Sequence, residues 1–592
     1  MPRSTAPGDR YSGVALPHAF ILIVFIYLLA LAFFTLFRLF FLANYAEFVA
    51  GVRVTELLTA FGIGWRFDQI VILIILAPLL LALPWIRLKT KLTRRILASY
   101  LTLAFSLCFL LLFADVRFYS VFDAHLNFLV YENLFTDTFV ADLAMSDPDF
   151  WLYVFLWMVV TALFAVLACR LIARLCKTRR TLPWWNRLGY FVLFTLLFAI
   201  GIRGRVGLAP MDWGVAYFSH DRFLNQLALN GVYTLGRNLW ERDHDPRLSN
   251  MPGGQRFPFM KESAALKSVQ GLLGEENDTW LDPDSNLSRR TLQPSLLPFK
   301  PNVVIVVMET WQGLTTGALG DIRHLTPHFD SLAAHGILFT NFYASGTRTA
   351  YGLSAILCSF PSLPGRAILK RYTANHPFVT LPTILHDRGY TNAFVYGGDF
   401  AFDNIEGFFR QHHYDRFYGY QYFPFDERFS KWGIPDKTLF DHVAALVDSI
   451  PRPFQFTVLT LSNHEPYDLP DSSVRKYMNE ADSSKMFNSQ IYADYALGAF
   501  MDELRAKSVF DSTIFLFVSD HGHYTNSPYP LDPRYFHIPL LIYSPAIIGD
   551  SARREPQFGG QVDILPTLLG LLGGNYTQAS WGRNLLNLPR GD

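Results

Sequence analysis

The sequence predicts a protein of two parts, an α-helical domain of five membrane spans followed by an exported α/β domain. Of its 592 residues, 51% are hydrophobic and only 17% are charged, which is too apolar for a soluble chain of this length. Stretches long enough to cross a bilayer are confined to roughly the first 205 residues. From about residue 300, short β-rich runs alternate with helical segments, the pattern of a largely parallel sheet.

Five stretches of the N-terminal part reach the roughly 20 apolar residues that a spanning helix needs. They lie at 17–43, 68–86, 96–114, 151–169 and 188–204. The first stretch is long, lacks a small-residue cleavage site and precedes further spans, so we expect it to be retained. The sequence therefore predicts an N-terminal tail at 1–16 and a membrane domain at 17–204.

Charges between the spans predict the orientation of the chain. The second and fourth loops are basic and should be cytoplasmic, whereas the third is acidic and should lie outside. The basic residues are Arg87, Lys89, Lys91, Arg94, Arg95, Arg170, Arg174, Lys177, Arg179, Arg180 and Arg187; the acidic ones are Asp115, Asp123, Glu132, Asp137, Asp142, Asp147 and Asp149. With a cytoplasmic N-terminus, five spans place everything after about residue 205 outside.

The net charge argues against a nucleic-acid partner, and the cysteine content excludes an internal disulfide in the polar half. A formal net charge of +1 argues against a nucleic-acid partner, because phosphate contacts need a concentrated basic surface. Of the four cysteines, only Cys358 falls in the polar half of the chain, so that half cannot hold an internal disulfide.

We predict that residues 205–299 form a membrane-surface linker between the two domains. The apolar spacing within 223–240 suits a helix lying along the membrane surface. A short core helix of the exported domain explains the same spacing about equally well.

The exported domain is expected at 300–592. The candidate strands are 302–309, 391–397, 454–462, 513–520 and 538–545, and the clearest helix is 488–507. Glu309 closes the first of these strands, and Asp520 with His521 closes another. Open α/β sheets place their sites at strand C-termini, and carboxylates and imidazole suit a divalent cation. A metal site is therefore a better interpretation of these residues than a helix cap.

A further element is the turn at 344–357, where small and hydroxyl residues precede a helical apolar pattern. The N-terminus of such a helix attracts anions and stabilises an oxyanion. On this reasoning alone, Ser345, Thr347 and Thr349 are almost equally eligible as nucleophiles.

Glu309, the GTRT turn at 346–349 and the SDHG at 519–522 together resemble the lipoteichoic acid synthase and phosphoglycerol transferase family, which has a sulfatase-like fold within the alkaline phosphatase superfamily. The resemblance extends to LSNHEPY, FHIPLLIYSP and QVDILPTLLGLLG, and to the five spans. It implies that Glu309, Thr349, Asp520 and His521 hold one divalent metal ion, manganese above zinc or magnesium. It also implies that Thr349 is the nucleophile, and that His464, Asp399 and His537 contact the substrate.

The resemblance further implies a metal-dependent phosphoglycerol transferase of the bacterial inner membrane. It would move the headgroup of phosphatidylglycerol to a glycan or polyol phosphate acceptor through a phosphothreonine intermediate. The alternatives are a phosphoethanolamine transferase, whose lipid A-modifying members usually carry disulfides, and a non-catalytic lipid sensor, in which the ligands and the nucleophile would have decayed.

Overall fold

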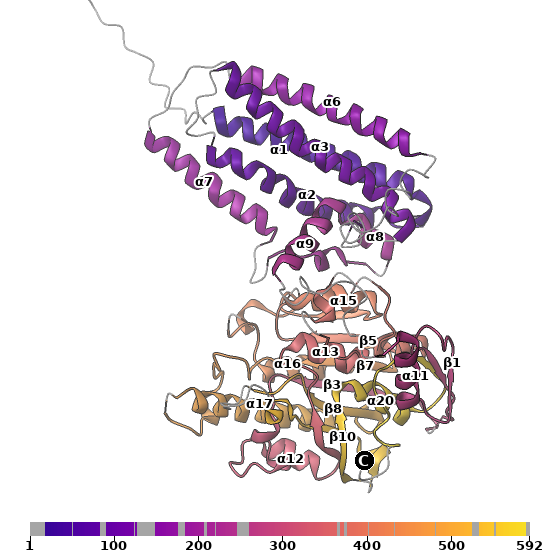
Figure 1. Ribbon diagram of the computed structural model, residues 1–592. Helices are drawn as coiled ribbons and strands as arrows, with labels where there is room; N and C mark the ends of the chain where they lie inside the picture. The colour runs from indigo at the N-terminus through magenta and orange to yellow at the C-terminus, as the bar shows by residue number, and fades with distance from the viewer. Residues whose placement is uncertain are drawn as a thin grey trace, which may run out of the picture. The chain divides into compact units, whose positions relative to one another are not determined.

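A computed structural model gives two compact units, Met1–His244 and Asp245–Asp592, which are described separately (Figure 1). The structure describes residues 18–49, 51–82, 90–122, 125–126, 149–175, 184–205, 210–219, 221–244, 260–295, 297–363, 367–371, 374, 376–400, 402–430, 432–479, 481–523, 532–549 and 552–587. The predicted tail at 1–16 lies outside these residues. So do most of the charges that predict the orientation, namely Arg87, Lys89, Asp123, Glu132, Asp137, Asp142, Asp147, Lys177, Arg179 and Arg180.

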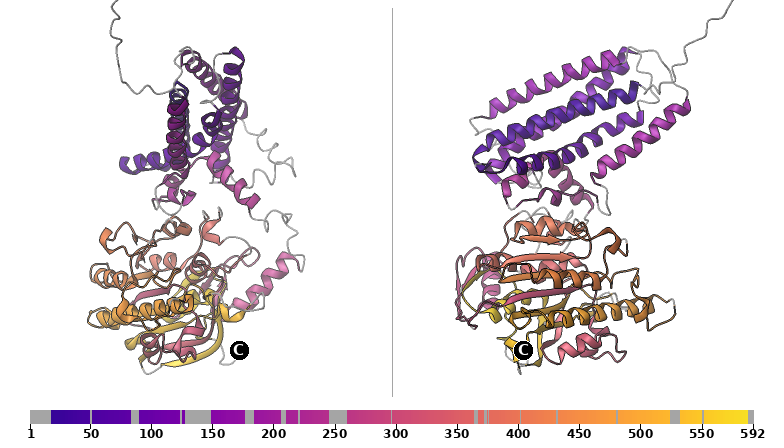
Figure 2. Two further views of the ribbon diagram at one scale, coloured as in Figure 1. Left: turned by 90° about the vertical axis from the view of Figure 1, so that its left-hand side faces the viewer. Right: turned by 180° about the vertical axis from the view of Figure 1, so that it is seen from behind.

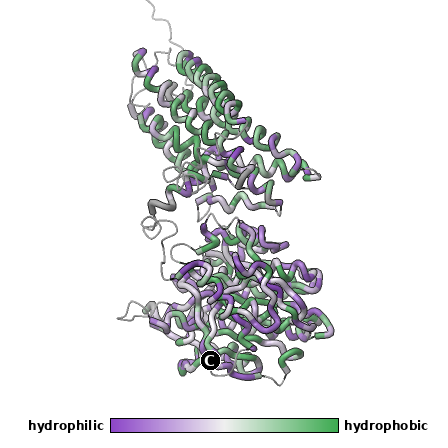
Figure 3. The backbone as a smooth tube through the Cα atoms, turned by 45° about the vertical axis from the view of Figure 1, so that its right-hand side comes forward, coloured by the Kyte–Doolittle hydropathy of each residue, from purple (hydrophilic) through white to green (hydrophobic). Residues whose placement is uncertain are grey.

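The first unit contains five helices that are long and apolar enough to cross a membrane, as expected. They are α1 (His18–Asn44), α2 (Val54–Ala82), α3 (Lys91–Phe122), α6 (Phe150–Leu175) and α7 (Trp184–Arg203). The hydropathy colouring of Figure 3 shows their apolar character. Helix α2 begins at Val54, well before the predicted start at 68, because Arg66 and Asp68 interrupt its apolar run without ending the helix.

Aromatic rings fill the interior of this unit. Phe33 and Phe37 of α1 pack against Phe109 of α3 at ring-centroid distances of 5.4 and 5.5 Å, and Phe164 of α6 packs on Phe33 at 5.4 Å. Only 11% of the most apolar window of α6 and of α7 is buried within the chain. Such exposed apolar faces suit contact with lipid acyl chains.

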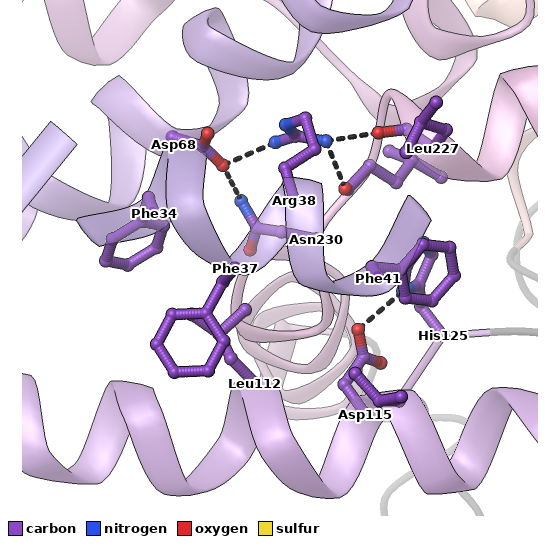
Figure 4. A pocket seen from close by; sticks show the side chains of 12 residues that line it. Phe34, Phe37, Arg38, Phe41, Asp68, Leu112, Asp115, His125, Leu227 and Asn230 are labelled. Atoms are coloured by element: carbon purple, nitrogen blue, oxygen red, sulfur yellow. Dashed lines mark hydrogen bonds and ion pairs between the residues drawn. The ribbon is translucent and has the colours of Figure 1, made fainter. Parts of the chain in front are cut away.

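Two shorter helices, α8 (Arg222–Leu227) and α9 (Gly231–His244), pack against the long helices of this unit. Figure 4 shows the buried polar network that holds the turn between them. Arg38 donates to the carbonyl oxygens of Leu227 and Leu229 and pairs with Asp68, with 2.6 Å between Nη2 and Oδ1. Asp115 accepts from the backbone N–H of Gly231 at 3.1 Å. The network thereby satisfies backbone groups that helix ends leave without partners.

The expected linker at 205–299 is therefore not one segment. Its run at 223–240 belongs to the first unit, so the alternative of a core helix in the exported domain is wrong. Residues 245–259 lie outside the described residues. Helix α11 (Glu262–Leu273) and strands β1 (Asp278–Trp280) and β2 (Arg289–Thr291) belong to the second unit, where β2 also pairs with β11 (Tyr576–Gln578).

An eight-stranded sheet forms the centre of the second unit (Figure 2). Its strand order is β10 (Arg553–Gly560), β4 (Ile337–Tyr343), β9 (Leu540–Tyr543), β8 (Thr513–Ser519), β3 (Asn302–Met308), β7 (Phe454–Leu459), β5 (Thr391–Tyr396) and β6 (Arg416–Tyr418). All five predicted strands are present. The one at 538–545 is β9, which runs antiparallel to both of its neighbours, while the other pairs are parallel.

Helices cover both faces of this sheet, which explains why β3, β7 and β8 are mostly apolar and fully buried. One face carries α12 (Pro327–Ala333), α16 (Asp436–Leu446) and α17 (Asp482–Arg505). Helix α14 (Leu381–Asp387) lies on the opposite face, where the Asn392 side chain of β5 donates to the Pro382 carbonyl oxygen at 2.9 Å. Helices α13 (Thr349–Cys358) and α20 (Ile564–Leu572) pack in the same layer, since α13 contacts both α14 and α20.

Candidate metal centre

Glu309 and Asp520 lie side by side because their strands are neighbours. Met308 of β3 is in register with Ser519 of β8, and each carboxylate is the residue that follows. His521 comes next in the chain. One ligand atom from each of Glu309, Asp520 and His521 lies within 4.8 Å of the others. The strand-end pattern in the sequence thus corresponds to one cluster at the C-terminal edge of the sheet.

Charge and burial in this cluster suit a divalent cation. Asp520 is 0% and Glu309 is 3% exposed. Burial, and then the Asp520 carboxylate beside it, raises the pKa of Glu309 well above its usual range. Within the described part of the chain, Asp520 Oδ2 has no hydrogen-bond partner, and His521 Nε2 lies 3.4 Å from it. Two buried carboxylates, an imidazole and an unpartnered oxygen form a set of ligands that fits such an ion.

Hydrogen bonds fix the orientation of the two carboxylates. Asp520 Oδ1 accepts from the backbone N–H groups of Thr310 and His521, each at 2.8 Å. Thr310 Oγ1 donates to Glu309 Oε1 at 2.6 Å. Thr310 has φ = +58°, a strained conformation for a β-branched residue that costs on the order of 1–3 kcal/mol. The strain allows Thr310 to reach both carboxylates.

Thr349 is the first residue of α13, and the first turn of this helix packs against the Asp520 backbone. A Cβ atom on Gly352 would lie 2.2 Å from the Asp520 carbonyl oxygen. Residues three apart share one side of a helix, so Thr349 lies on the side of α13 that faces the Asp520 backbone. Its hydroxyl has no hydrogen-bond partner among the described residues. Thr347 precedes the helix, and Ser345 donates its backbone N–H elsewhere.

Gln561 is a residue that the sequence did not single out. Its side chain is fully buried; Nε2 donates to the carbonyl oxygens of Ser519 and Asp520, and Oε1 accepts from the Ser345 N–H. It therefore joins the strand end that carries Asp520 to the turn that carries Thr349. The only signal for it was its place at the start of the QVDILPT run.

The three residues expected to contact the substrate, His464, Asp399 and His537, differ from one another in their neighbours. His464 follows Asn463, whose side chain donates to the carbonyl oxygens of Glu309 and Thr310, and its ring packs on Trp432 at 4.5 Å. Asp399 follows β5 and accepts a long contact of 3.5 Å from Gln421.

The contacts of the His537 side chain are structural. Its Nε2 bonds to the Thr340 carbonyl oxygen at 2.9 Å, and its ring packs on Tyr343 at 5.4 Å. None of the contacts described for His537 involves Glu309, Asp520 or His521.

Three other polar residues of the second unit also have defined surroundings. His523 bonds to the Tyr467 hydroxyl at 2.6 Å, which links the loops that follow β7 and β8. His412 is buried, and Arg348 is exposed as the N-cap residue of α13.

Comparisons with known proteins give the same fold. Residues 301–574 match the sulfatase family. The chain is 26% identical over 296 residues to the lipoteichoic acid synthase-like YvgJ of Bacillus subtilis, covering 46% of this chain and 47% of the relative. It is 24% identical over 295 residues to the lipoteichoic acid synthase of Staphylococcus aureus, covering 46% and 45%. The matches span about half the length of these relatives.

A solved structure of an alkaline phosphatase superfamily protein from Vibrio parahaemolyticus superimposes with a TM-score of 0.50 at 29% identity. It covers 56% of this chain and 79% of the other. The resemblance found in the sequence is thus confirmed at the level of the fold.

Proposed function

Because residues 301–574 form a sulfatase-family domain of the alkaline phosphatase superfamily, similar to that of lipoteichoic acid synthases, we propose that the protein transfers a phosphorylated headgroup from a membrane lipid to an acceptor. The headgroup is phosphoglycerol, and the donor is phosphatidylglycerol. The acceptor is a glycan or a polyol phosphate of the cell envelope. The observation that carries the proposal is the unpartnered Thr349 hydroxyl at a helix N-terminus, on the side of α13 that faces the backbone of Asp520, which clusters with Glu309 and His521.

Thr349 Oγ1 attacks the lipid phosphorus, and the bond to the diacylglycerol oxygen breaks, leaving the headgroup as a phosphothreonine ester. The threonine proton goes to the diacylglycerol oxygen. A divalent ion held by Glu309, Thr349, Asp520 and His521, manganese above zinc or magnesium, supplies positive charge that stabilises the alkoxide and the phosphoryl oxygens. The N-terminus of α13 adds N–H groups that favour the same negative charge.

An acceptor hydroxyl then attacks the phosphothreonine ester, and its proton returns to Thr349 Oγ1. One oxyanion site serves both displacements, which is the reason for splitting the transfer into two steps. In this proposal His464 contacts the substrate phosphate, a role supported by the Asn463 side chain, which anchors the same loop on the Glu309–Thr310 backbone.

The five long helices of the first unit suit an enzyme whose donor is a lipid. We propose a multi-pass protein of the bacterial inner membrane with its catalytic domain outside. Reporter fusions at about residues 90 and 180 should be cytoplasmic, and fusions at about 130 and after 300 should be external. A cytoplasmic signal from the last fusion would contradict the proposal.

One specific feature favours a second candidate. Asp399, just after β5, is acidic and would suit the ammonium group of phosphatidylethanolamine. Labelled phosphatidylglycerol and phosphatidylethanolamine supplied in parallel to the full-length protein decide between them. Release of diacylglycerol from the first lipid supports phosphoglycerol transfer; release from the second alone transfers the assignment to phosphoethanolamine.

A further inference from the structure

Four exposed or partly exposed aromatic side chains, in the segments between β5 and α16, are here called the aromatic rim. They are Phe402, Phe425, Phe429 and Trp432. Phe425 is 80%, Phe429 48% and Phe402 36% exposed. Burial of a phenylalanine side chain is favourable, and Phe425 leaves most of that free energy unrealised in water.

The aromatic rim is anchored at the same edge of the sheet as the carboxylates. Gly397 and Gly398 directly follow β5, and their carbonyl oxygens accept from the backbone N–H groups of Ile434 at 3.1 Å and Tyr420 at 2.9 Å. Trp432 packs on His464 at 4.5 Å and donates from Nε1 to the Glu465 carbonyl oxygen at 3.0 Å. The rim therefore borders the loop that carries His464.

Local contacts hold the rim in place, so its exposure does not come from a frayed loop. The Arg428 guanidinium lies 3.8 Å from the ring centre of Tyr420 and 5.1 Å from that of Phe425. Arg428 also donates to the Tyr420 carbonyl oxygen at 3.0 Å, and Phe402 packs on Trp432 at 6.1 Å. A positive charge thus lies among fixed, solvent-facing rings.

We infer that the aromatic rim contacts the interfacial region of a phospholipid bilayer and receives the glycerol and upper acyl chains of the donor lipid. This inference rests on the proposed function. Tryptophan is enriched at membrane interfaces, and phenylalanine with nearby basic residues is typical of segments that lie in the interface. The same polypeptide carries five helices that can span a membrane, so a bilayer is tethered to this domain.

A second copy of the chain is less suited than a lipid bilayer to cover the aromatic rim. A stable protein interface buries about 800 Å² on each partner, whereas a whole aromatic side chain offers only about 150–250 Å². Four rings, two of them half-buried or more, fall short of that area.

Photocrosslinking in the full-length protein, reconstituted in phosphatidylglycerol-containing vesicles, tests the contact without requiring turnover. A p-benzoylphenylalanine at position 425 should crosslink to phospholipid. The matched control is the same group at Ile322, which is 87% exposed and distant in sequence, where no lipid adduct is expected. Equal lipid labelling at both positions, or crosslinks from 425 only to protein, would overturn the inference.

Steady-state kinetics distinguish the lipid contact of Phe425 from the transfer reaction itself. Phe425→Ser should raise KM for vesicle-borne donor lipid at least fivefold and leave kcat unchanged, and Ile322→Ser should change neither. A water-soluble glycerophosphodiester should be turned over by Phe425→Ser as by wild type. An unchanged KM for vesicle lipid would overturn the inference while leaving the transferase proposal intact. A wild-type protein that releases no diacylglycerol would instead refute the transferase itself, and the crosslinking result would still judge the lipid contact.

Discussion

The Gln561 side chain and the Asp520 backbone are joined by a hydrogen bond of 2.7 Å, donated by Nε2 to the carbonyl oxygen. The same nitrogen donates to the Ser519 carbonyl oxygen at 2.8 Å, and Oε1 accepts from the Ser345 N–H at 2.8 Å. One buried amide therefore joins the proposed metal ligand Asp520 to the turn before the proposed nucleophile Thr349. Five predictions follow from this arrangement and its surroundings.

Gln561→Met should lower kcat about 100-fold, because it keeps the side-chain volume while releasing the two segments, and small misplacements are costly in catalysis. Gln270→Met is the control, since Gln270 also donates to two carbonyl oxygens, those of Pro283 and Asn286, but in α11. Both variants should lose some stability. Steady-state kinetics at saturating lipid should show the loss of kcat only for Gln561→Met; equal kcat values would show that Gln561 has no positioning role.

Gly352→Ala should abolish activity and weaken metal binding, because its Cβ would lie 2.2 Å from the Asp520 carbonyl oxygen and would push α13 off the strand end. Gly271→Ala in α11, where a Cβ meets no atom within 4 Å, should be neutral or stabilising by about 0.5–1 kcal/mol. Metal content and turnover measured side by side check this. Full activity in Gly352→Ala would mean that α13 does not need this close approach.

Asp520→Asn should remove the bound metal while keeping the fold, since an amide oxygen can still accept from the N–H groups of Thr310 and His521. Elemental analysis of the purified protein should give one divalent ion per wild-type chain and little in the variant. Chelators should abolish wild-type activity. Asp494→Asn is the control, because Asp494 is another buried aspartate that accepts from the backbone N–H groups of His328 and Phe329. Equal metal in Asp520→Asn and wild type would contradict the site.

Thr349→Ala should retain the fold and much of the metal but lose turnover by several orders of magnitude, because it removes the attacking oxygen. Thr347→Ala, outside the helix, should be milder. After incubation with lipid but no acceptor, intact-mass measurement should reveal an adduct that peptide mapping places on residues 346–352. An adduct that persists in Thr349→Ala would rule out this threonine as the nucleophile.

His412 should make the second unit less stable in acid. Burial lowers its pKa from 6.5 to about 4, and the ring is neutral, with Nδ1 donating to the Phe408 carbonyl oxygen and Nε2 accepting from the Phe378 N–H. Between these pH values only the unfolded chain binds the proton. The free energy of unfolding should therefore fall as the pH drops from about 6.5 to 4, by up to about 3 kcal/mol.

His412→Gln keeps an acceptor for the Phe378 N–H but cannot titrate, so its stability should vary less with pH in this window. Thermal unfolding at pH 7, 5.5 and 4.5 measures the difference, with exposed His335→Gln as the control. The same slope in wild type and His412→Gln would show that other groups cause the acid sensitivity.

The sequence by itself determined the features that arise from local pattern. A run of about 20 apolar residues must satisfy its backbone as a helix in lipid, so five helices could be counted without any tertiary contact. The mostly apolar strands β3 and β8 could also be recognised from local pattern, and Glu309, Asp520 and His521 were conspicuous as the polar residues that follow them. The choice of Thr349 rather than Thr347 as the nucleophile came from the resemblance alone.

Only the tertiary structure decided what depends on residues far apart in the chain. Strands β4 and β10 were not recognised from the sequence, and the antiparallel direction of β9 depends on which strands it lies between. Arg38 and Asp115 hold the turn between α8 and α9 from distant helices, which places that turn in the first unit. Gln561 lies 41 residues after Asp520, and its three hydrogen bonds are all to backbone groups, which every residue carries and no sequence pattern distinguishes.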